Sequence, residues 1–260
     1  MLAVLPYVGV LLLAIYAKLA KKLTASGTIA AIFVGFAITW GFGWIGLLTL
    51  GLFFFSSSFL SSFKQHLKED DINEKGSTRD GMQVLANGGV AAVMSVLYGV
   101  FLSPLYAIGF FASLAAANAD TWASEIGPLS KKRPVHIATC KRVDKGTSGA
   151  ISTLGTFAAL VGSFVIACIG LLFDVTNSLL MIIIIAISGF VGNVMDTLIG
   201  AYSQVLYRCN RCRMNTERKI HCGSRTEQIR GLKWVNNDIV NMSCTISAAI
   251  IAMIIAWFIV

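Results

Sequence analysis

Eight long apolar segments divide this chain, and they limit the folds it can adopt more than any other feature. They cover about residues 3–20, 24–40, 44–62, 82–102, 104–119, 149–173, 177–199 and 239–260. A bilayer core about 30 Å thick takes roughly 20 apolar residues in a helix. Only 13 % of the residues are charged, about half the usual fraction for a soluble domain. The segments therefore predict an all-α polytopic membrane bundle of about eight transmembrane helices. They exclude a water-soluble enzyme and a disordered chain.

The 21 Lys and Arg residues test this division, because cytoplasmic loops carry an excess of basic residues. All of them fall in four clusters that follow the first, third, fifth and seventh segments. The pattern predicts one membrane domain, residues 1–260, with both termini outside and cytoplasmic loops at 64–81, 120–148 and 203–236. The net charge of +8 then reflects topology, so membrane lipids and no nucleic acid are the expected partners. We expect an integral protein of the cell membrane or an organelle membrane.

Polar side chains gather at the cytoplasmic ends of five of these segments. They are Arg79, Gln83, Asn87, Asn118, Asp120, Glu125, Lys145, Asn193, Asp196, Asn237, Asp238 and Asn241. Polar residues inside a span cost a few kcal/mol and usually face a bundle interior or a cavity. Asn and Asp also cap helices, but capping explains Asn87, Asn193 and Asp196 poorly because they lie within apolar helices. The pattern favours one shared site at the cytoplasmic boundary of the membrane.

The residue types at this site are those of phosphoryl transfer. The carboxylates of Asp120, Glu125 and Asp196 suit Mg²⁺, which prefers a few carboxylates together with phosphate oxygens. Basic side chains and a glycine-rich loop suit phosphate: Lys75, Arg79, Lys145 and the loop Gly146, Thr147, Ser148 and Gly149. That loop is also compatible with a small-residue helix start that permits close packing. A phosphate site at the membrane surface indicates a lipid substrate with an anionic head group.

Five sequence blocks carry a family resemblance over nearly the whole chain. They are Lys75–Gly89, Ala119–Gly127, Gly146–Gly149 with Gly155-Thr156, Asp196–Ala201 and Asn236–Asn241. In composition and order they resemble the integral membrane family that includes the plant phytyl-phosphate kinase of the tocopherol pathway. The resemblance implies phosphate transfer from a nucleoside triphosphate, with CTP expected, to a prenyl monophosphate such as phytyl, geranylgeranyl or farnesyl phosphate. The product would be the prenyl diphosphate.

The resemblance also implies roles for individual residues. Asp120 and Glu125 would hold Mg²⁺ on the triphosphate, with Asp196 as a second-rank ligand. Lys75, Arg79 and Lys145 would neutralise the phosphates. The amides that would orient phosphate oxygens or metal-bound water are those of Gln83, Asn87, Asn118, Asn193, Asn237 and Asn241. Asp238 is either a further metal ligand or the N-terminal cap of the last helix.

Three other readings remain open at this stage. A transporter or flippase of an anionic lipid or small anion would place its site near the bilayer midplane, whereas these polar residues lie at one face. A membrane scaffold without chemistry would not need polar residues to converge from five helices. A lipid cytidylyltransferase or phosphotransferase would use a similar set of residues, and product analysis separates it from a kinase.

The last cytoplasmic loop contains a possible zinc knuckle. Cys209 and Cys212 are followed by His221 and Cys222, and four such ligands suit one tetrahedral structural Zn²⁺. Adjacent His and Cys ligands are less usual, so unliganded thiols and a redox dithiol are the alternatives. Isolated His136 is expected to be a solvated loop residue.

Overall fold

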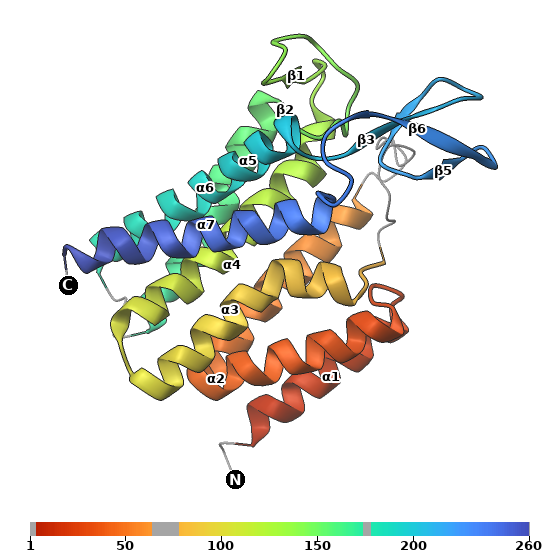
Figure 1. Cartoon of the computed structure of the whole chain (residues 1–260). Helices are drawn as coiled ribbons and strands as arrows, with labels where there is room; N and C mark the ends of the chain where they lie inside the picture. Colours follow the sequence, from red (N-terminus) through yellow and green to blue (C-terminus); the bar gives the residue numbers. More distant parts are fainter. Residues whose placement is uncertain (1–3, 64–77, 174–177, 260) are drawn as a thin grey trace.

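Helix α4 (Pro104–Ile126) lies at the centre of the molecule, and every residue from Ala107 to Ala119 is buried. Its alanines and glycine present a narrow surface, which lets α2, α3, α5, α6 and α7 all pack against it. The computed structural model describes residues 4–63, 78–173 and 178–259. In those residues the helices are α1 (Leu5–Leu19), α2 (Ala25–Ser62), α3 (Gly81–Phe101), α4, α5 (Thr153–Ile169), α6 (Leu179–Tyr202) and α7 (Asn237–Trp257) (Figure 1).

Five of the helices in the described residues are long and apolar enough to cross a membrane: α2, α3, α6, α7 and α5 with the short 3₁₀ turn Gly170–Leu172 that follows it. Helix α1 is apolar but shorter, and α4 is less apolar although it is the most enclosed. The polytopic all-α membrane bundle is therefore confirmed. The count of eight spans and the outside placement of both termini stay predictions.

Helix α2 contains a sharp kink at Gly43, where φ is 52° and ψ is −129°. Only glycine adopts this left-handed backbone without a steric penalty. Val34 and Leu50 line the same apolar pocket although they lie on opposite sides of the kink, so the two arms fold back on each other. The predicted segments 24–40 and 44–62 correspond to these arms.

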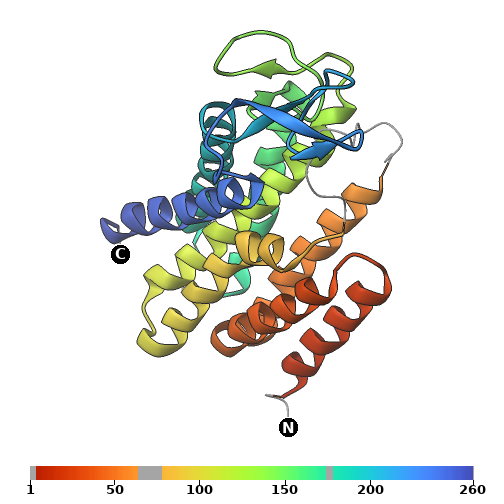
Figure 2. The ribbon, with the colours of Figure 1, turned by 45° about the vertical axis from the view of Figure 1, so that its right-hand side comes forward.

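The strands and the longest loops gather at one end of the bundle, and the two chain termini lie away from them (Figures 1 and 2). Strands β1 (Val135–His136) and β2 (Ala150–Ile151) pair in antiparallel fashion. A second sheet has the order β4-β3-β6-β5. Its members are β3 (Leu206–Cys209), β4 (Asn215–Thr216), β5 (Ile220–His221) and β6 (Ser224–Arg230).

Two loop boundaries differ from the prediction. The predicted loop 120–148 begins inside α4, because that helix continues to Ile126 and a 3₁₀ turn follows at Gly127–Leu129. Side-chain contacts with α2 accompany this continuation, because Trp122 Nε1 donates to Ser56 Oγ and Ser61 Oγ donates to Glu125. The predicted loop 203–236 contains the four-stranded sheet, whose strands are too short and too polar to stand out from sequence alone.

Candidate active site

A polar pocket of about 340 Å³ opens at the strand end of the bundle. Helices α3, α4, α6 and α7 and the loop before α5 all contribute to it. Its lining includes Arg79, Gln83, Asn87, Asp120, Glu125, Lys145, Gly146, Thr147, Ser148, Gly149, Asn193, Asp196, Asn237, Asp238 and Asn241. The structure thus brings together residues that the sequence analysis singled out from distant parts of the chain. Their catalytic and metal-binding roles stay predictions. Lys75 lies outside the described residues.

Asp120 of α4 and Asp196 of α6 place their carboxyl groups in contact with each other. Asn193 Nδ2 donates to Asp120 Oδ1 at 3.3 Å. The Asn241 amide, oriented so that its nitrogen faces acceptors, donates to Asp196 Oδ1 at 3.2 Å. Two buried carboxylates in contact repel each other when both are charged. Carboxylate oxygens paired in this way suit a hard divalent cation.

Close packing of α6 holds this pair in place. At Gly189 a Cβ atom would lie 2.7 Å from Ala115 Cβ of α4, and at Gly192 it would lie 3.0 Å from Ala116 Cβ. The two glycines therefore let α6 approach α4 more closely than larger residues would allow. Asn193 and Asp196 follow directly on α6 and face α4 at short range.

Glu125 lies apart from the aspartate pair. It accepts a hydrogen bond from Ser61 Oγ, and its charge acts on Arg79. Asp120 and Glu125 are five residues apart on α4, which separates them by about 140° around the helix. In the part of the chain that the structure describes, no three of the Asp and Glu side chains come close enough to share one ion. The predicted trio Asp120, Glu125 and Asp196 therefore does not form a single ligand cluster here.

Arg79 is fixed by its backbone to the turn between α1 and α2. Arg79 N donates to Lys22 O at 2.9 Å, and Thr24 N donates to Arg79 O at 3.0 Å. A Cβ at Gly27 would lie 2.3 Å from Arg79 O, so a glycine is needed for this approach. Burial lowers the pKa of the Arg79 guanidinium, and the nearby Glu125 carboxylate counteracts the shift. A partly desolvated guanidinium is a strong ligand for phosphate.

The N-termini of three helices face the pocket. The N-cap of α3 is Asp80, that of α5 is Ser152 and that of α7 is Asn236, and each side chain accepts a hydrogen bond from its own first turn. Residues of these first turns line the pocket, among them Gly155 and Asp238. The positive ends of helix dipoles favour anions. The pocket therefore combines a cation-attracting aspartate pair with three anion-attracting helix ends.

The sequence predicts that the loop Gly146–Gly149 leads directly into a helix, but in the structure it does not. Strand β2 and Ser152 intervene, and α5 begins at Thr153. Gly149 has φ of 79°, and a Cβ there would lie 2.3 Å from Ala201 Cα. Ser148 Oγ donates to Gln204 Oε1. The loop is thus packed against the end of α6, and its glycine conformation serves close packing.

Three of the amides that the sequence singles out form hydrogen bonds within the protein, and their contacts with substrate stay predictions. Asn118 is fully buried and does not line the pocket. Its Nδ2 donates to Gly162 O at 2.8 Å and its Oδ1 accepts from Ser56 Oγ at 3.2 Å, so it joins α4 to α5 and α2. Gln83 forms a capping box with Asp80, and Asn87 Nδ2 donates to Gln83 O at 2.9 Å.

Glu217 is a pocket residue that the sequence analysis missed. It is buried, it lines the pocket, and it accepts a hydrogen bond from Gln204 Nε2 at 2.7 Å. Its charge acts on Asp196. The available signal was its position as one of two acidic residues in a loop that carries eight basic ones. Thr121 and Asn236 also line the pocket.

An apolar pocket of about 100 Å³ adjoins the polar one. Helices α1, α2 and α3 form it, and its lining includes Val10, Ala14, Val34, Leu47, Leu50 and Phe53. Arg79, Gln83, Asn87 and Thr121 line both pockets. A ligand with a charged head and an apolar tail would satisfy both environments.

Comparison with known proteins gives the family. The model of the integral membrane protein family DUF92 matches residues 8–249. The chain is 32 % identical over 198 residues to an uncharacterized membrane protein of Methanocaldococcus jannaschii, covering 75 % of this chain and 82 % of that protein.

Two proteins of Arabidopsis thaliana are similarly related. The chloroplastic protein VTE6 is 30 % identical over 250 residues, covering 93 % of this chain and 67 % of that protein. Protein PGR is 31 % identical over 218 residues, covering 73 % and 75 %. No solved structure matches the chain. The family match and these relatives together establish that the chain belongs to the DUF92 family of integral membrane proteins.

Proposed function

We propose that this protein is a membrane-embedded kinase. It transfers the terminal phosphate of a nucleoside triphosphate, with CTP as the expected donor, to a prenyl monophosphate and gives the prenyl diphosphate. The observation that carries the proposal is the junction of the polar and apolar pockets at Arg79, Gln83, Asn87 and Thr121. An amphiphilic acceptor fits this junction with its phosphate at Arg79 and its chain between α1, α2 and α3.

The donor set of the polar pocket fits Mg²⁺. The contacting carboxyl groups of Asp120 and Asp196 supply hard oxygen ligands, and Glu217 lies near enough for its charge to act on Asp196. Bound there, the ion would neutralise charge on the triphosphate. We propose Asp120 and Asp196 as its ligands, with Glu125 or Glu217 within reach of the same substrate through bound water.

The protein's own residues would act mainly by positioning and by neutralising charge. Arg79 binds the acceptor phosphate, and Lys145 with the N-termini of α5 and α7 binds the triphosphate. A prenyl phosphate oxygen is already an anionic nucleophile, so the reaction needs no strong general base. The attacking oxygen displaces the nucleoside diphosphate, and the transferred phosphate forms a new P–O bond to the acceptor. Preorganised cations and helix ends stabilise the charge that spreads over the transferred group.

The end of the bundle that carries the polar pocket also supports a membrane topology. The two arms of α2 count as separate spans, which with the other six helices gives about eight, and both termini lie outside. The described basic clusters and the polar pocket then face the cytoplasm, in agreement with the positive-inside rule. A nucleoside triphosphate such as CTP would reach the pocket from the cytoplasmic side.

The test uses purified protein in detergent with Mg²⁺. γ-Labelled CTP, ATP, GTP and UTP are supplied in parallel with phytyl, geranylgeranyl or farnesyl monophosphate. We expect label in a prenyl diphosphate, lost in Asp120→Asn and retained in Glu227→Gln, whose side chain is exposed on β6 and outside the pocket. Folded protein that transfers no label from any nucleotide would contradict the kinase. Prenyl-phosphate binding without turnover would instead favour a lipid transporter, and transfer of a nucleotidyl group would favour a cytidylyltransferase.

A further inference from the structure

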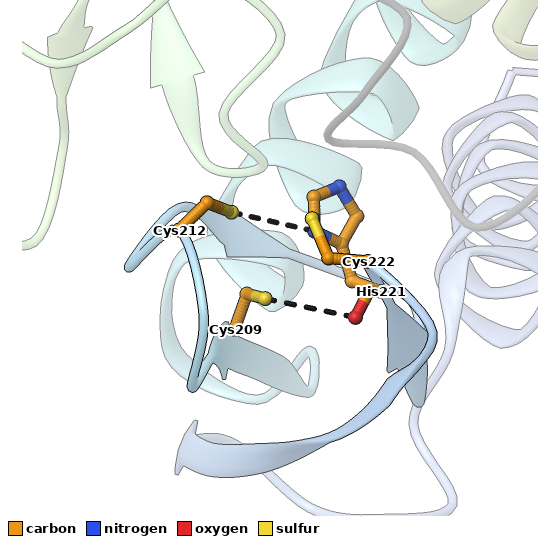
Figure 3. Close-up of side chains that lie close together, drawn as sticks. All are labelled: Cys209, Cys212, His221 and Cys222. Atoms are coloured by element: carbon orange, nitrogen blue, oxygen red, sulfur yellow. Dashed lines mark hydrogen bonds between the residues drawn. The ribbon is translucent and has the colours of Figure 1, made fainter.

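Four metal-ligating side chains meet at the tips of two hairpin turns in the β3–β6 sheet. Cys209 ends β3 and Cys212 lies in the turn that follows it, whereas His221 ends β5 and Cys222 lies in the turn between β5 and β6. Their ligand atoms all lie within 4.8 Å of one another. Figure 3 shows the two turns facing each other with the side chains directed into the space between them.

The spacing of these atoms is close to that of a tetrahedral zinc shell. With Zn–S distances of about 2.3 Å and Zn–N distances of about 2.0–2.1 Å, neighbouring ligand atoms lie roughly 3.5–3.8 Å apart. His221 Nδ1 lies 3.5 Å from Cys212 Sγ and 3.2 Å from Cys222 Sγ. The four ligands are therefore already placed so that one ion would need only small shifts.

The backbone of both turns is shaped to present these ligands. Arg211 N donates to Cys209 Sγ at 3.4 Å, a contact that stabilises a thiolate. Cys222 and Gly223 have φ values of 52° and 69° between the paired residues His221 and Ser224. Turns with two positive φ values strongly prefer Asn, Asp or Gly at both positions. A cysteine in the first of them carries a steric cost that a bound ion would offset.

The surroundings favour an anionic cluster. Three thiolates and one Zn²⁺ carry a net charge of −1, and the strands and turns around the cluster are rich in arginine, with Arg208, Arg211, Arg213 and Arg225 among them. The protein supplies all four ligands, so a zinc ion bound here would have no open coordination position for a substrate. The site is structural in character.

We infer that Cys209, Cys212, His221 and Cys222 bind one structural Zn²⁺, which clamps the two turns and fixes the route of the chain into the polar pocket. Strand β4 leads from the first turn to Glu217, which lines the polar pocket and accepts a hydrogen bond from Gln204 Nε2. Holding the turn therefore holds Glu217. This inference is independent of the proposed kinase activity, because it concerns the sheet and its metal.

Metal content is the first test. Protein purified in detergent without chelator should contain about one zinc per chain, and Co²⁺ exchanged into it should show the absorption of a tetrahedral thiolate site. Cys212→Ser and Cys222→Ser alter exposed ligands and should each lower the zinc content at least fivefold. Cys140→Ser is the matched control, since Cys140 is an exposed free cysteine with a positive φ outside the cluster. Folded wild-type protein that takes up no zinc on reconstitution, or zinc that survives both ligand variants, would overturn the inference.

A protease gives a second readout that does not depend on metal analysis. Eight Lys and Arg residues from Arg208 to Lys233, both included, make the sheet a ready target for trypsin. Zinc-loaded protein should resist cleavage there, and removal of zinc by chelator should speed cleavage at least tenfold while the helices stay intact. Equal cleavage with and without zinc would contradict the clamp. A Cys–Cys disulfide found by mass spectrometry under non-reducing conditions would replace the metal site with a covalent link.

Discussion

Arg230 Nη1 lies 2.6 Å from His136 Nε2, and this contact joins the end of β6 to the first strand of the β1–β2 pair. Arg230 Nη2 also donates to Gly200 O at 3.2 Å at the end of α6. His136 is buried, so the expectation that it is a solvated loop residue is wrong. The pair ties both sheets to the helix that carries Asp196, which makes it a support of the candidate active site.

This contact predicts a dependence of stability on pH. Burial, and then the Arg230 charge, lower the pKa of His136 below its usual value of 6.5. Folding therefore favours the neutral ring. Its contribution to stability is present above the unfolded pKa and is lost as the pH falls through the folded pKa. Thermal unfolding in detergent between pH 7.5 and pH 5 should show a declining midpoint. His136→Gln keeps an acceptor without titrating, so its midpoint should decline less; an equal decline would contradict this assignment.

The tight packing of Gly149 predicts a large loss of stability in Gly149→Ala. The new Cβ would lie 2.3 Å from Ala201 Cα, and φ of 79° is unfavourable for alanine. Strain and overpacking of this kind cost roughly 1–3 kcal/mol each. Gly89→Ala on α3 is the control, because the nearest atom to its Cβ, Leu85 Cβ, is 4.0 Å away. The measurement is the thermal unfolding midpoint of both variants. Equal midpoints would contradict the prediction and show that the loop accommodates the new Cβ without a large loss of stability.

The aspartate pair predicts opposite effects of one substitution with and without metal. Asp196→Asn removes the repulsion between two contacting carboxylates, so the variant should be more heat-stable than wild type in EDTA. It should also lose the stabilisation that Mg²⁺ gives the wild type. Glu125→Gln should keep most of that stabilisation, since Glu125 lies with Ser61 and Arg79. A Mg²⁺ response lost in Glu125→Gln and kept in Asp196→Asn would reverse the assignment of ligands.

The apolar pocket predicts a selective effect on the acceptor. Leu50→Trp should fill part of the pocket between α1, α2 and α3, and KM for phytyl phosphate should rise about tenfold or more. KM for the nucleotide should stay within about twofold. Leu48→Trp serves as the comparison because Leu48 is exposed on the outer side of the same helix. A similar rise in both variants would point to general damage to α2.

The apolar segments predicted the helices well because membrane helices need long runs of apolar residues. The polar residues at their ends predicted most of the pocket lining, since such residues are tolerated inside a bundle only where they meet one another. The positions of Asn193 and Asp196 within an apolar helix were the clearest signal.

Other features depend on tertiary contacts that a sequence pattern does not encode. The part of α4 from Asp120 to Ile126 contacts α2 through the hydrogen bonds of Trp122 with Ser56 and of Glu125 with Ser61. Asn118, like Asn193, is an amide side chain within an apolar helix. It forms hydrogen bonds with Ser56 and Gly162 and does not line the pocket. Glu217 reaches the pocket only through the path of the β3–β6 sheet. Asp120 and Glu125 share a helix but diverge around it, which separates two predicted ligands.

The junction of the two pockets also has a consequence for which concentration of the acceptor, in water or in the membrane, controls the reaction rate. A lipid whose chain lies between α1, α2 and α3 is delivered by the bilayer, whereas a nucleotide arrives from water. The occupancy of the first site would follow the mole fraction of acceptor in the membrane, and diluting it with inert lipid at constant total amount would slow the reaction. Arg79 would thus lie where a substrate that diffuses in the membrane meets a substrate that diffuses in water.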